Sequence, residues 1–236
     1  MHTFEQVFAP ISARRILDVA TGAGGFIQAL METLQSYTEI IGIDASERFA
    51  AVFAETFAEK PVRFVNMDAA RLDFPDGHFD MVCIANSLHH LEKPEEVLAE
   101  MLRVLRPGGW FVVSEMYRDD QSEAQLTHVL MHDWWGAVDT ARGVTHRETY
   151  PRQAIVGIVQ DLGLAHCDFY DIAYLDEDPR APELAQHLNG VIDQYLQRAE
   201  GLPGQDELQQ RGQELRQRVQ VHGFHGATSL LALGKR

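Results

Sequence analysis

Apolar and polar positions alternate in two ways along the first half of the chain. Short apolar runs of strand length predict β-strands, and apolar residues that recur three or four positions apart predict helices. The expected order is strand 15–20, helix 25–36, strand 39–44, helix 46–58, strand 62–66, strand 79–85, helix 94–105 and strand 109–116. Such alternation is typical of a parallel sheet with helices on both faces, whose ligand crevice lies above the carboxyl ends of the strands.

The pattern changes after Met116. Residues 117–150 are polar and rich in aromatic and histidine side chains, and we expect this insertion to cover the crevice. Pro151 predicts the start of a helix that reaches about Leu162. Two further strands are expected, one within 165–175 and the last within 227–236.

About fifty residues separate those two strands, and their spacing predicts a pair of helices within 176–224. The break at 202–204 divides the pair. The second helix, which ends near Val221, has few apolar positions and can bury only a thin stripe. It packs on a partner subunit, forms part of a cap or lies as a solvated surface hairpin, and the sequence leaves these alternatives open.

A glycine turn follows the first predicted strand. This strand ends near Asp18, and Gly22, Gly24 and Gly25 follow at once, so that backbone can approach a ligand closely at the start of a helix. The next strand ends at Asp44, where a carboxylate could hold two ribose hydroxyls. The pattern predicts an adenosine site, and at this point both nicotinamide and sulfonium cofactors remain open.

Two residues argue against a dinucleotide. Ile27 stands where the dinucleotide fingerprint has its third glycine, and Asp18 would repel a pyrophosphate. A cationic or zwitterionic ligand suits this acid better.

Three segments resemble the class I S-adenosylmethionine-dependent methyltransferases. The stretch ILDVATGAGGF is similar to their first motif, hhDhGxGxG, with Ala20 in place of the first glycine. RFVNMDAARLDFPDGHFDMVCIANSLHHL resembles the third and fourth strands of the small-molecule branch, which includes the quinone and sterol C-methyltransferases. RVLRPGGWFVVSEM resembles the turn into strand five, so the resemblance covers about 14–116.

The resemblance implies a fold, a cofactor and a set of binding residues. The fold is α/β, a doubly wound, mostly parallel seven-stranded sheet of the Rossmann-like methyltransferase type, with the last strand antiparallel and helical insertions after strands five and six. The cofactor is S-adenosyl-L-methionine. The implied cofactor-binding residues are Asp18, Ala20, Thr21, Gly22, Gly24, Asp44, Ala45, Asp68, Ala69 and Asn86.

We expect a single methyltransferase domain over 1–236. It comprises a cofactor-binding core at 14–116, a substrate cap at 117–150 and a helical insertion at 176–224. A homodimer through the 176–224 helices is one arrangement that this division allows.

Composition narrows the partners. With 20 basic and 35 acidic residues, the chain would repel nucleic acid and anionic membranes, which favours a small-molecule acceptor. The sequence contains no apolar stretch of membrane-spanning length and no basic start followed by an apolar run. Cys83 and Cys167 lie in apolar strand-like segments and are expected to be buried thiols, which fits the reducing cytoplasm.

Methyl transfer needs a base only when the acceptor arrives protonated. The candidates are His89, His90, His132, Asp133 and His146, of which we name His89 and His132 as catalytic. His128 and His132 are four residues apart, a spacing that could hold a metal, but a polar helix face is the preferred interpretation and we expect no metal. Trp134 and Trp135 cannot face the same side of a helix, so one is expected in the core and the other against the substrate chamber.

Three functions remain as alternatives. The first is a methyltransferase that acts on an oxygen, nitrogen or carbon atom of a small molecule by direct displacement. The second is a non-catalytic protein that binds S-adenosylmethionine as a sensor or scaffold. The third, which Asp18 and Ile27 disfavour, is an NAD-dependent oxidoreductase.

Overall fold

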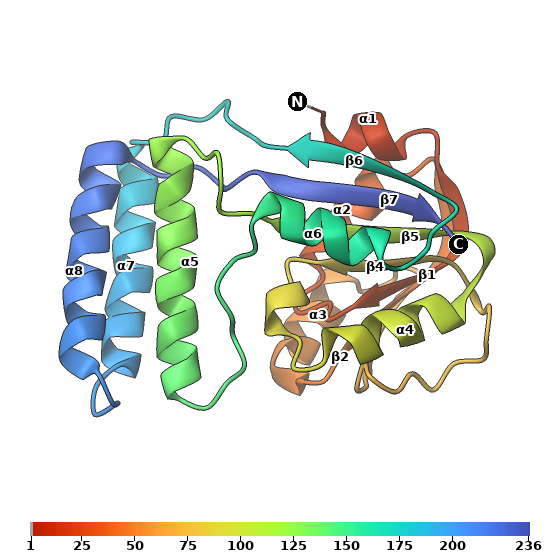
Figure 1. Cartoon of the computed structure of the whole chain (residues 1–236), viewed down its shortest axis with the longest axis horizontal. Helices are drawn as coiled ribbons and strands as arrows, with labels where there is room; N and C mark the ends of the chain where they lie inside the picture. Colours follow the sequence, from red (N-terminus) through yellow and green to blue (C-terminus); the bar gives the residue numbers. More distant parts are fainter. Residues whose placement is uncertain (1) are drawn as a thin grey trace.

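A seven-stranded sheet forms the centre of the molecule in the computed structural model, which describes residues 2–236 (Figure 1). The strands are β1 (Ser12–Val19), β2 (Ser36–Asp44), β3 (Val62–Asn66), β4 (Phe79–Ala85), β5 (Leu105–Met116), β6 (His166–Ile172) and β7 (Ser229–Lys235). Their order across the sheet is β3-β2-β1-β4-β5-β7-β6. The pairings from β3 to β5 are parallel, whereas β7 runs antiparallel to both β5 and β6. The predicted fold class is confirmed, including its antiparallel last strand.

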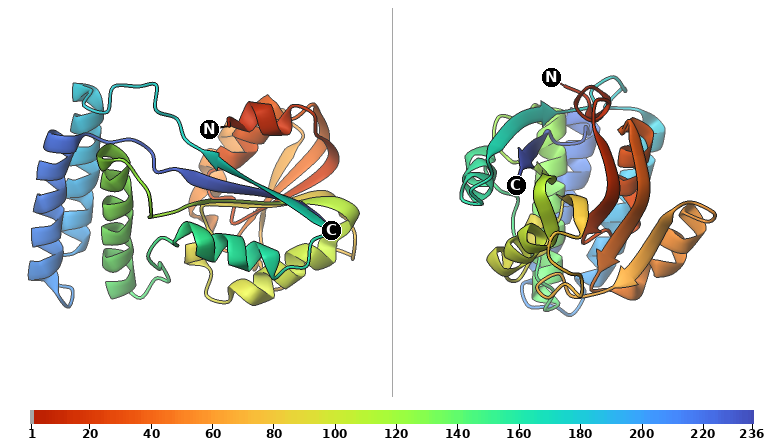
Figure 2. Two further views of the ribbon diagram at one scale, coloured as in Figure 1. Left: turned by 45° about the horizontal axis from the view of Figure 1, so that its top comes forward. Right: turned by 90° about the vertical axis from the view of Figure 1, so that its right-hand side faces the viewer.

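Two helical layers cover the sheet because its buried strands are apolar on both faces. Along β1, Ile16 joins one core with the helices α1 (Phe4–Phe8), α2 (Gly25–Thr33) and α3 (Ala50–Thr56). The next residue, Leu17, joins a second core with α4 (Pro94–Val104) and α6 (Arg152–Gln160). Successive side chains of a strand point to opposite faces, which accounts for this alternation. Figure 2 shows the helices on either side of the twisted sheet.

Three long helices form a bundle beyond the carboxyl ends of the parallel strands (Figures 1 and 2). They are α5 (Glu123–Ala141), α7 (Pro182–Arg198) and α8 (Gln205–His222). Trp134 of α5 is fully buried in their shared core, and its indole NH donates to the Leu208 carbonyl of α8 over 2.8 Å. The predicted helical pair is therefore present, and it packs on α5 of its own chain.

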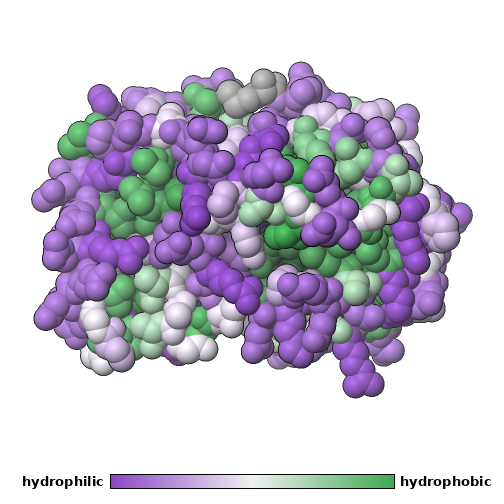
Figure 3. Space-filling view, in the orientation of Figure 1, coloured by the Kyte–Doolittle hydropathy of each residue, from purple (hydrophilic) through white to green (hydrophobic). Residues whose placement is uncertain are grey.

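The thin apolar stripe of α8 is used within the chain. Leu208, Leu215 and Val219 are buried in the bundle core beside Met131 and Trp134 of α5. Burial of this kind stabilises the helix mainly through its apolar face, since α8 has few apolar residues elsewhere. The stripe therefore neither lies in solvent nor needs a partner subunit to cover it. Figure 3 shows a mostly hydrophilic face, with hydrophobic patches over the bundle and over the sheet.

Several element boundaries differ from the predictions, among them the end of α2, which lies at Thr33 rather than at 36. β1 and β2 begin three residues earlier than expected, because Ser12 pairs with Ser36 at the polar start of the parallel ladder. The predicted helix 46–58 is a 3-10 turn, η1 (Glu47–Phe49), followed by the short α3. β5 begins at Leu105 rather than 109, since Leu105 pairs with Phe79 before an irregularity in the register. Among the described residues, none of the helices is long and apolar enough to span a bilayer.

Candidate cofactor and substrate site

The turn after β1 adopts backbone conformations that favour glycine. Gly22 has a φ of +52° and Gly24 a φ of +85°. A Cβ atom on Gly24 would lie 2.3 Å from the Phe57 ring, so only glycine fits there without a shift of the ring. Ala20, which replaces the first glycine of the motif, also has a positive φ of +54°. The turn thus keeps the left-handed conformation at Ala20 despite its methyl group.

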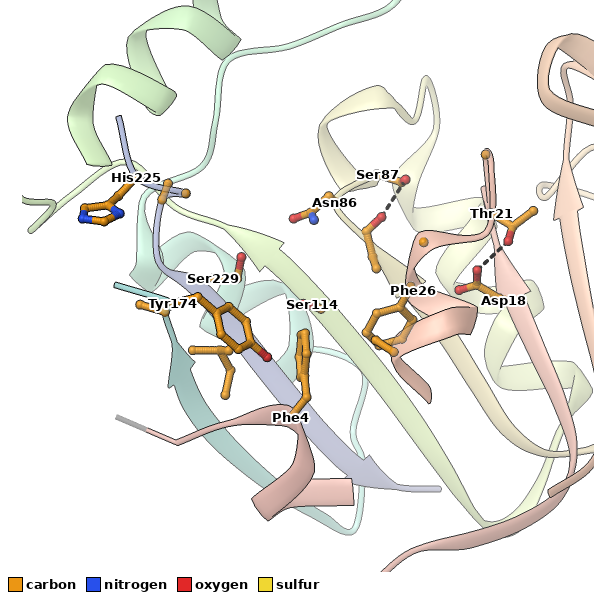
Figure 4. A pocket seen from close by; sticks show the side chains of 18 of the residues that line it. Phe4, Asp18, Thr21, Phe26, Asn86, Ser87, Ser114, Tyr174, His225 and Ser229 are labelled. Carbon is orange, nitrogen blue, oxygen red and sulfur yellow. Dashed lines mark hydrogen bonds between the residues drawn. The ribbon is translucent and has the colours of Figure 1, made fainter. Parts of the chain in front are cut away.

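Asp18 is a buried acid with one unused oxygen. The Thr21 hydroxyl donates to its Oδ2 over 2.6 Å, while Oδ1 has no hydrogen-bond partner within the described chain (Figure 4). The pKa of Asp18 is raised to about 7, chiefly because the carboxyl is buried; the Thr21 hydrogen bond lowers it in part, and the nearby Asp44 adds a smaller rise. A cationic group beside Oδ1 would stabilise the carboxylate that burial disfavours.

Asp44 is tied to the same turn at the end of β2. Its Oδ2 accepts from the Gly22 amide over 3.0 Å, and its Oδ1 accepts from the Ser46 amide over 2.9 Å. Each carboxylate oxygen keeps a further lone pair for a ligand hydroxyl. Ala45 follows directly, so the edge of this turn carries an acceptor pair held in place by backbone donors.

Asp68 and Ala69 follow β3 and lie next to the end of β2. The Met67 amide donates to the Asp44 carbonyl over 3.0 Å, which holds the start of this loop against Asp44. The Asp68 carboxylate accepts from the Ala70 amide over 2.9 Å. Parallel pairing of Asp44 with Asn66 explains why acids that are distant in sequence meet here.

Asn86 bridges the ends of β4 and β5. Its φ of +46° is left-handed, a conformation that asparagine tolerates better than most residues. The backbone amide of Asn86 donates to the Ser114 carbonyl over 2.7 Å, and its side-chain oxygen accepts from the backbone amide of Met116 over 3.2 Å. The side chain is therefore fixed at the carboxyl edge of the sheet.

A cavity of about 840 Å³ opens above this edge. Half of the predicted cofactor residues line it, namely Asp18, Ala20, Thr21, Gly22 and Asn86. The other half, Gly24, Asp44, Ala45, Asp68 and Ala69, are not among its lining residues. They lie along the β1–β2–β3 side of the edge, beside the glycine turn.

The opposite wall comes from α1, from the segment after β6 and from the link before β7. Phe4 of α1 and Tyr174 after β6 lie opposite the turn across the cavity, and His225 before β7 lies farther from the turn, with its ring pointing away from it (Figure 4). Within the described chain, the lining residues include carboxylates at Asp18, Asp176 and Glu177 but no lysine or arginine. The wall is therefore aromatic and acidic.

The 117–150 insertion lies elsewhere than expected. Over residues 2–236, the lining of this cavity includes no residue from 117–150, because α5 packs into the bundle instead. Trp135 packs beside Tyr195, with ring centroids 5.6 Å apart, and does not close the chamber. Instead, the cavity is covered by α1, by the segment that follows β6 and by the link that precedes β7.

The two histidines named as catalytic do not line the cavity either. His89, in the short turn η2 (Leu88–His90), is fully buried, and His132 of α5 is nearly so. The structure brings both together with His90 and His146, whereas His128 accepts a hydrogen bond from the Ala227 amide. His225, which is not among the candidate bases named from the sequence, does line the wall. The sequence contains one signal for this placement: His225 lies in the short link before the last strand, and this link must cross the carboxyl edge of the sheet.

Comparisons with known proteins agree with this architecture. Residues 17–113 match the sequence profile of the family described as "Methyltransferase domain". A ubiquinone/menaquinone biosynthesis C-methyltransferase UbiE from Azotobacter vinelandii is 35% identical over 105 residues, which cover 43% of this chain and 42% of that protein. The chain thus spans less than half the length of the curated relatives it matches.

Two solved structures share the fold along nearly the whole chain. A structure from Bacillus halodurans, described as that of a candidate methyltransferase, superposes with a TM-score of 0.60 at 18% identity and covers 98% of this chain and 96% of its own. Haemonchus contortus phosphoethanolamine N-methyltransferase 2, in complex with S-adenosyl-L-methionine, has a TM-score of 0.59 at 17% identity, with 98% and 50% covered. Together with the sheet order and the glycine turn, these findings support a class I S-adenosylmethionine-dependent methyltransferase whose core, residues 17–113, matches the methyltransferase domain and resembles the quinone C-methyltransferases.

Proposed function

We propose that this protein transfers a methyl group from S-adenosylmethionine to a small, uncharged or cationic acceptor. The observation that carries the proposal is the buried Asp18 carboxyl, which lines the cavity beside the glycine turn and has one oxygen without a hydrogen-bond partner in the described chain. An acid in this position suits a positively charged ligand and disfavours a phosphate. The single domain over 1–236, with its core at 14–116, is the unit to which we assign this activity.

The residues at the carboxyl edge fit that cofactor. When bound, S-adenosylmethionine supplies a methyl group activated by its sulfonium. We assign Asp18 to the ammonium group and Asp44 to the ribose hydroxyls, since both carboxylates have free lone pairs and are held by donors of the turn. We assign the shape of the turn to Ala20, Thr21, Gly22 and Gly24. The adenine would be flanked by Ala45, Asp68 and Ala69, and the methionine end of the cofactor would lie beside Asn86.

The acceptor class follows from the cavity wall. Phe4, Phe26, Tyr174 and Phe224 offer aromatic faces, and Asp176 and Glu177 add negative charge. Aromatic faces and carboxylates attract cations and flat apolar groups and repel anions. Such a wall aligns an acceptor and excludes water, which is the main contribution that a displacement reaction requires of the protein.

A histidine that can act as a general base lines the cavity. His225 lines the wall, and we propose it for the proton of an acceptor that arrives protonated. For His89 and His132 the same role has no support in the geometry, since neither is a lining residue.

Calorimetry with S-adenosylmethionine and S-adenosylhomocysteine tests the cofactor assignment. Asp44→Ala should weaken binding roughly tenfold or more, because hydrogen bonds to a charged group contribute about 1.5–3 kcal/mol each. Asp73→Ala, at an exposed acid outside the cavity, is the matched control. Unchanged affinity in Asp44→Ala would remove the proposal. A screen of cationic and uncharged metabolites for S-adenosylhomocysteine release then tests turnover, and binding without any turnover would favour a sensor.

We propose two further properties of the protein. A cytoplasmic location is supported by Cys83 and Cys167, which are both free thiols, since disulfides are rare in reducing compartments. A homodimer through the 176–224 helices has one exposed apolar side chain, Val221, in its favour. Light scattering after size-exclusion chromatography would decide the oligomeric state.

A further inference from the structure

Four imidazoles converge between the sheet and the bundle, away from the cavity lining. They belong to His89, His90, His132 and His146, and one ring nitrogen of each lies within 4.8 Å of the corresponding nitrogens of the others. The residues come from three separate segments: the turn η2 after β4, helix α5 and the loop between α5 and α6. The proposed methyl transfer uses none of them.

Three of these rings have a nitrogen with nothing to bind. His89 Nε2, His132 Nδ1 and His146 Nε2 are buried and have no hydrogen-bond partner within the described chain. Leaving a buried polar atom unpaired destabilises a fold, so three such atoms gathered in one cluster need an explanation.

Carboxylates orient two of the rings from behind. His89 Nδ1 is hydrogen-bonded to the buried Glu115, and His146 Nδ1 lies 3.0 Å from Asp139 Oδ2. When Nδ1 carries the proton and donates to a carboxylate, Nε2 presents a lone pair. Histidines that bind metals are characteristically held in this way, with the second nitrogen donating to a carboxylate.

Two carboxyl groups lie beside the cluster. Glu115 and Asp139, which orient His89 and His146, would balance the positive charge of a divalent ion.

The backbone around the cluster is fixed. The Arg147 amide donates to the His89 carbonyl over 3.0 Å, and the Thr140 hydroxyl donates to the His146 carbonyl over 3.0 Å. A Cβ atom on Gly136 would lie 3.1 Å from the His146 ring, so glycine at this point of α5 lets the loop approach closely. The surface groove over 143–151 reaches His146, and His90 is exposed, so an ion has a route to the cluster.

We propose that His89, His90, His132 and His146 bind one divalent first-row transition-metal ion, with Zn²⁺ as the ion that fits best. Imidazole nitrogens suit Zn²⁺, and four protein ligands are typical of a closed, structural zinc site. Zn–N bonds of about 2.0–2.1 Å place tetrahedral nitrogens roughly 3.3 Å apart, so modest rotation of the rings would close the site. The ion would join η2, α5 and the 142–150 loop. This replaces the expectation of no metal, which considered only the pair His128 and His132.

Metal loading of the full chain is the first test. After treatment with a chelator, equilibrium dialysis against ZnCl₂ should give one bound ion per chain, measured by mass spectrometry. Co²⁺ in its place should give the visible absorption of a tetrahedral complex. If neither ion binds stoichiometrically, the cluster is a water-filled polar pocket and the proposal is overturned.

Variants identify the ligands. His132→Gln and His146→Gln should each weaken Zn²⁺ binding by at least about 100-fold, and Asp139→Asn, which acts through His146, by about 10- to 100-fold. His187→Gln, at an exposed histidine on α7, should bind as the parent does. Equal affinity in the parent and in both ligand variants would overturn the proposal.

X-ray absorption of the Zn-loaded parent chain needs no variant. The expected spectrum has only nitrogen or oxygen neighbours, with the outer scattering of three or four imidazoles. Sulfur neighbours, or fewer than three imidazoles, would assign the ion to another place and overturn the proposal. Calorimetry with S-adenosylmethionine on the same samples keeps the outcome separate from the proposed function, because the cluster does not line the cavity.

Discussion

Asp18 shows how one buried residue couples ligand charge to protonation. Its carboxyl is fully enclosed and has a single hydrogen-bond donor within the described chain, the Thr21 hydroxyl. Removal from water penalises the charged form, whereas a neighbouring cation favours it. Binding of a cationic cofactor should therefore release a proton from Asp18 wherever the free protein holds one.

The affinity for S-adenosylmethionine should rise with pH up to about 7. Below the raised pKa of about 7, the free protein must lose the Asp18 proton before the carboxylate can pair with a cation, so affinity changes up to about tenfold per pH unit. Calorimetry between about pH 5.5 and 7.5, in buffers of different ionisation enthalpy, measures both affinity and released protons. Asp18→Asn should bind more weakly, with a flat profile. An equally steep profile in Asp18→Asn would contradict this assignment.

The same group predicts the pH dependence of stability without ligand. Because the pKa of Asp18 is higher in the folded chain than its ordinary value of 3.8, the folded state binds more protons between these values. Its contribution to the free energy of unfolding is therefore present at low pH and is lost as pH rises through about 7. Asp18→Asn should remove that loss, which thermal unfolding of the two proteins at about pH 5 and about pH 8 would detect.

Glycine is required at position 24 because the backbone there is left-handed and because the Phe57 ring lies close to it. Gly24→Ala should lower the free energy of unfolding by about 2 kcal/mol or more, since it adds left-handed strain and a contact with Phe57. Gly25→Ala is the matched control, because it has ordinary φ and no atom within 4 Å of the added Cβ. Urea unfolding compares the two variants, and similar losses in both would rule out strain and the Phe57 contact as the cause.

At the scale of elements, the bundle depends on close packing between α5, α7 and α8. Gly212 of α8 faces Leu196 and Trp134, and an added Cβ would lie 2.7 Å from each side chain. Trp134 also links α5 to α8 through its hydrogen bond to the Leu208 carbonyl. The small residue therefore sets how closely the three helices approach.

Two glycine-to-alanine variants in neighbouring helices should shift stability in opposite directions. Gly212→Ala should lower the free energy of unfolding by about 1–3 kcal/mol through overpacking, despite the better helix propensity of alanine. At Gly190 of α7, no atom lies within 4 Å of an added Cβ. Gly190→Ala should therefore raise the free energy of unfolding by about 0.5–1 kcal/mol. Urea midpoints measure both, and shifts of the same sign would show that the packing at Gly212 is looser than these distances imply.

At the scale of the whole molecule, net charge acts on stability. The formal charge of −15 at pH 7 makes the folded chain repel itself, since compaction brings like charges closer together. Salt screens this repulsion over a Debye length of about 10 Å at 0.1 M.

Added KCl should therefore raise the unfolding temperature at pH 7. The same addition near the sequence pI of about 5.1 should have little effect and serves as the control. Differential scanning calorimetry measures both series. A fall in the unfolding temperature with salt at pH 7 would mean that attractive pairs such as Arg103–Glu100 outweigh the general repulsion.

The sequence by itself determined the sheet and the glycine turn at its carboxyl edge. Strand and helix periodicities are local, and the glycines of the turn and the acids that end β1 and β2 lie within one strand–helix–strand unit. Their chemistry follows from neighbours close in the chain, so Asp18, Gly22 and Asp44 could be named from the sequence alone. Boundaries such as the start of β5 depend on pairing with another strand, which local pattern does not contain.

Only the tertiary structure decided what surrounds that edge. The packing of α5 into the bundle keeps 117–150 away from the cavity, and Phe4, Tyr174 and His225 line its wall instead. The histidine cluster also needed folding, because His89, His132 and His146 come from segments whose proximity no spacing encodes. Side chains that meet only through packing have no sequence signature, and for this reason both the acceptor wall and the proposed metal site came from the fold.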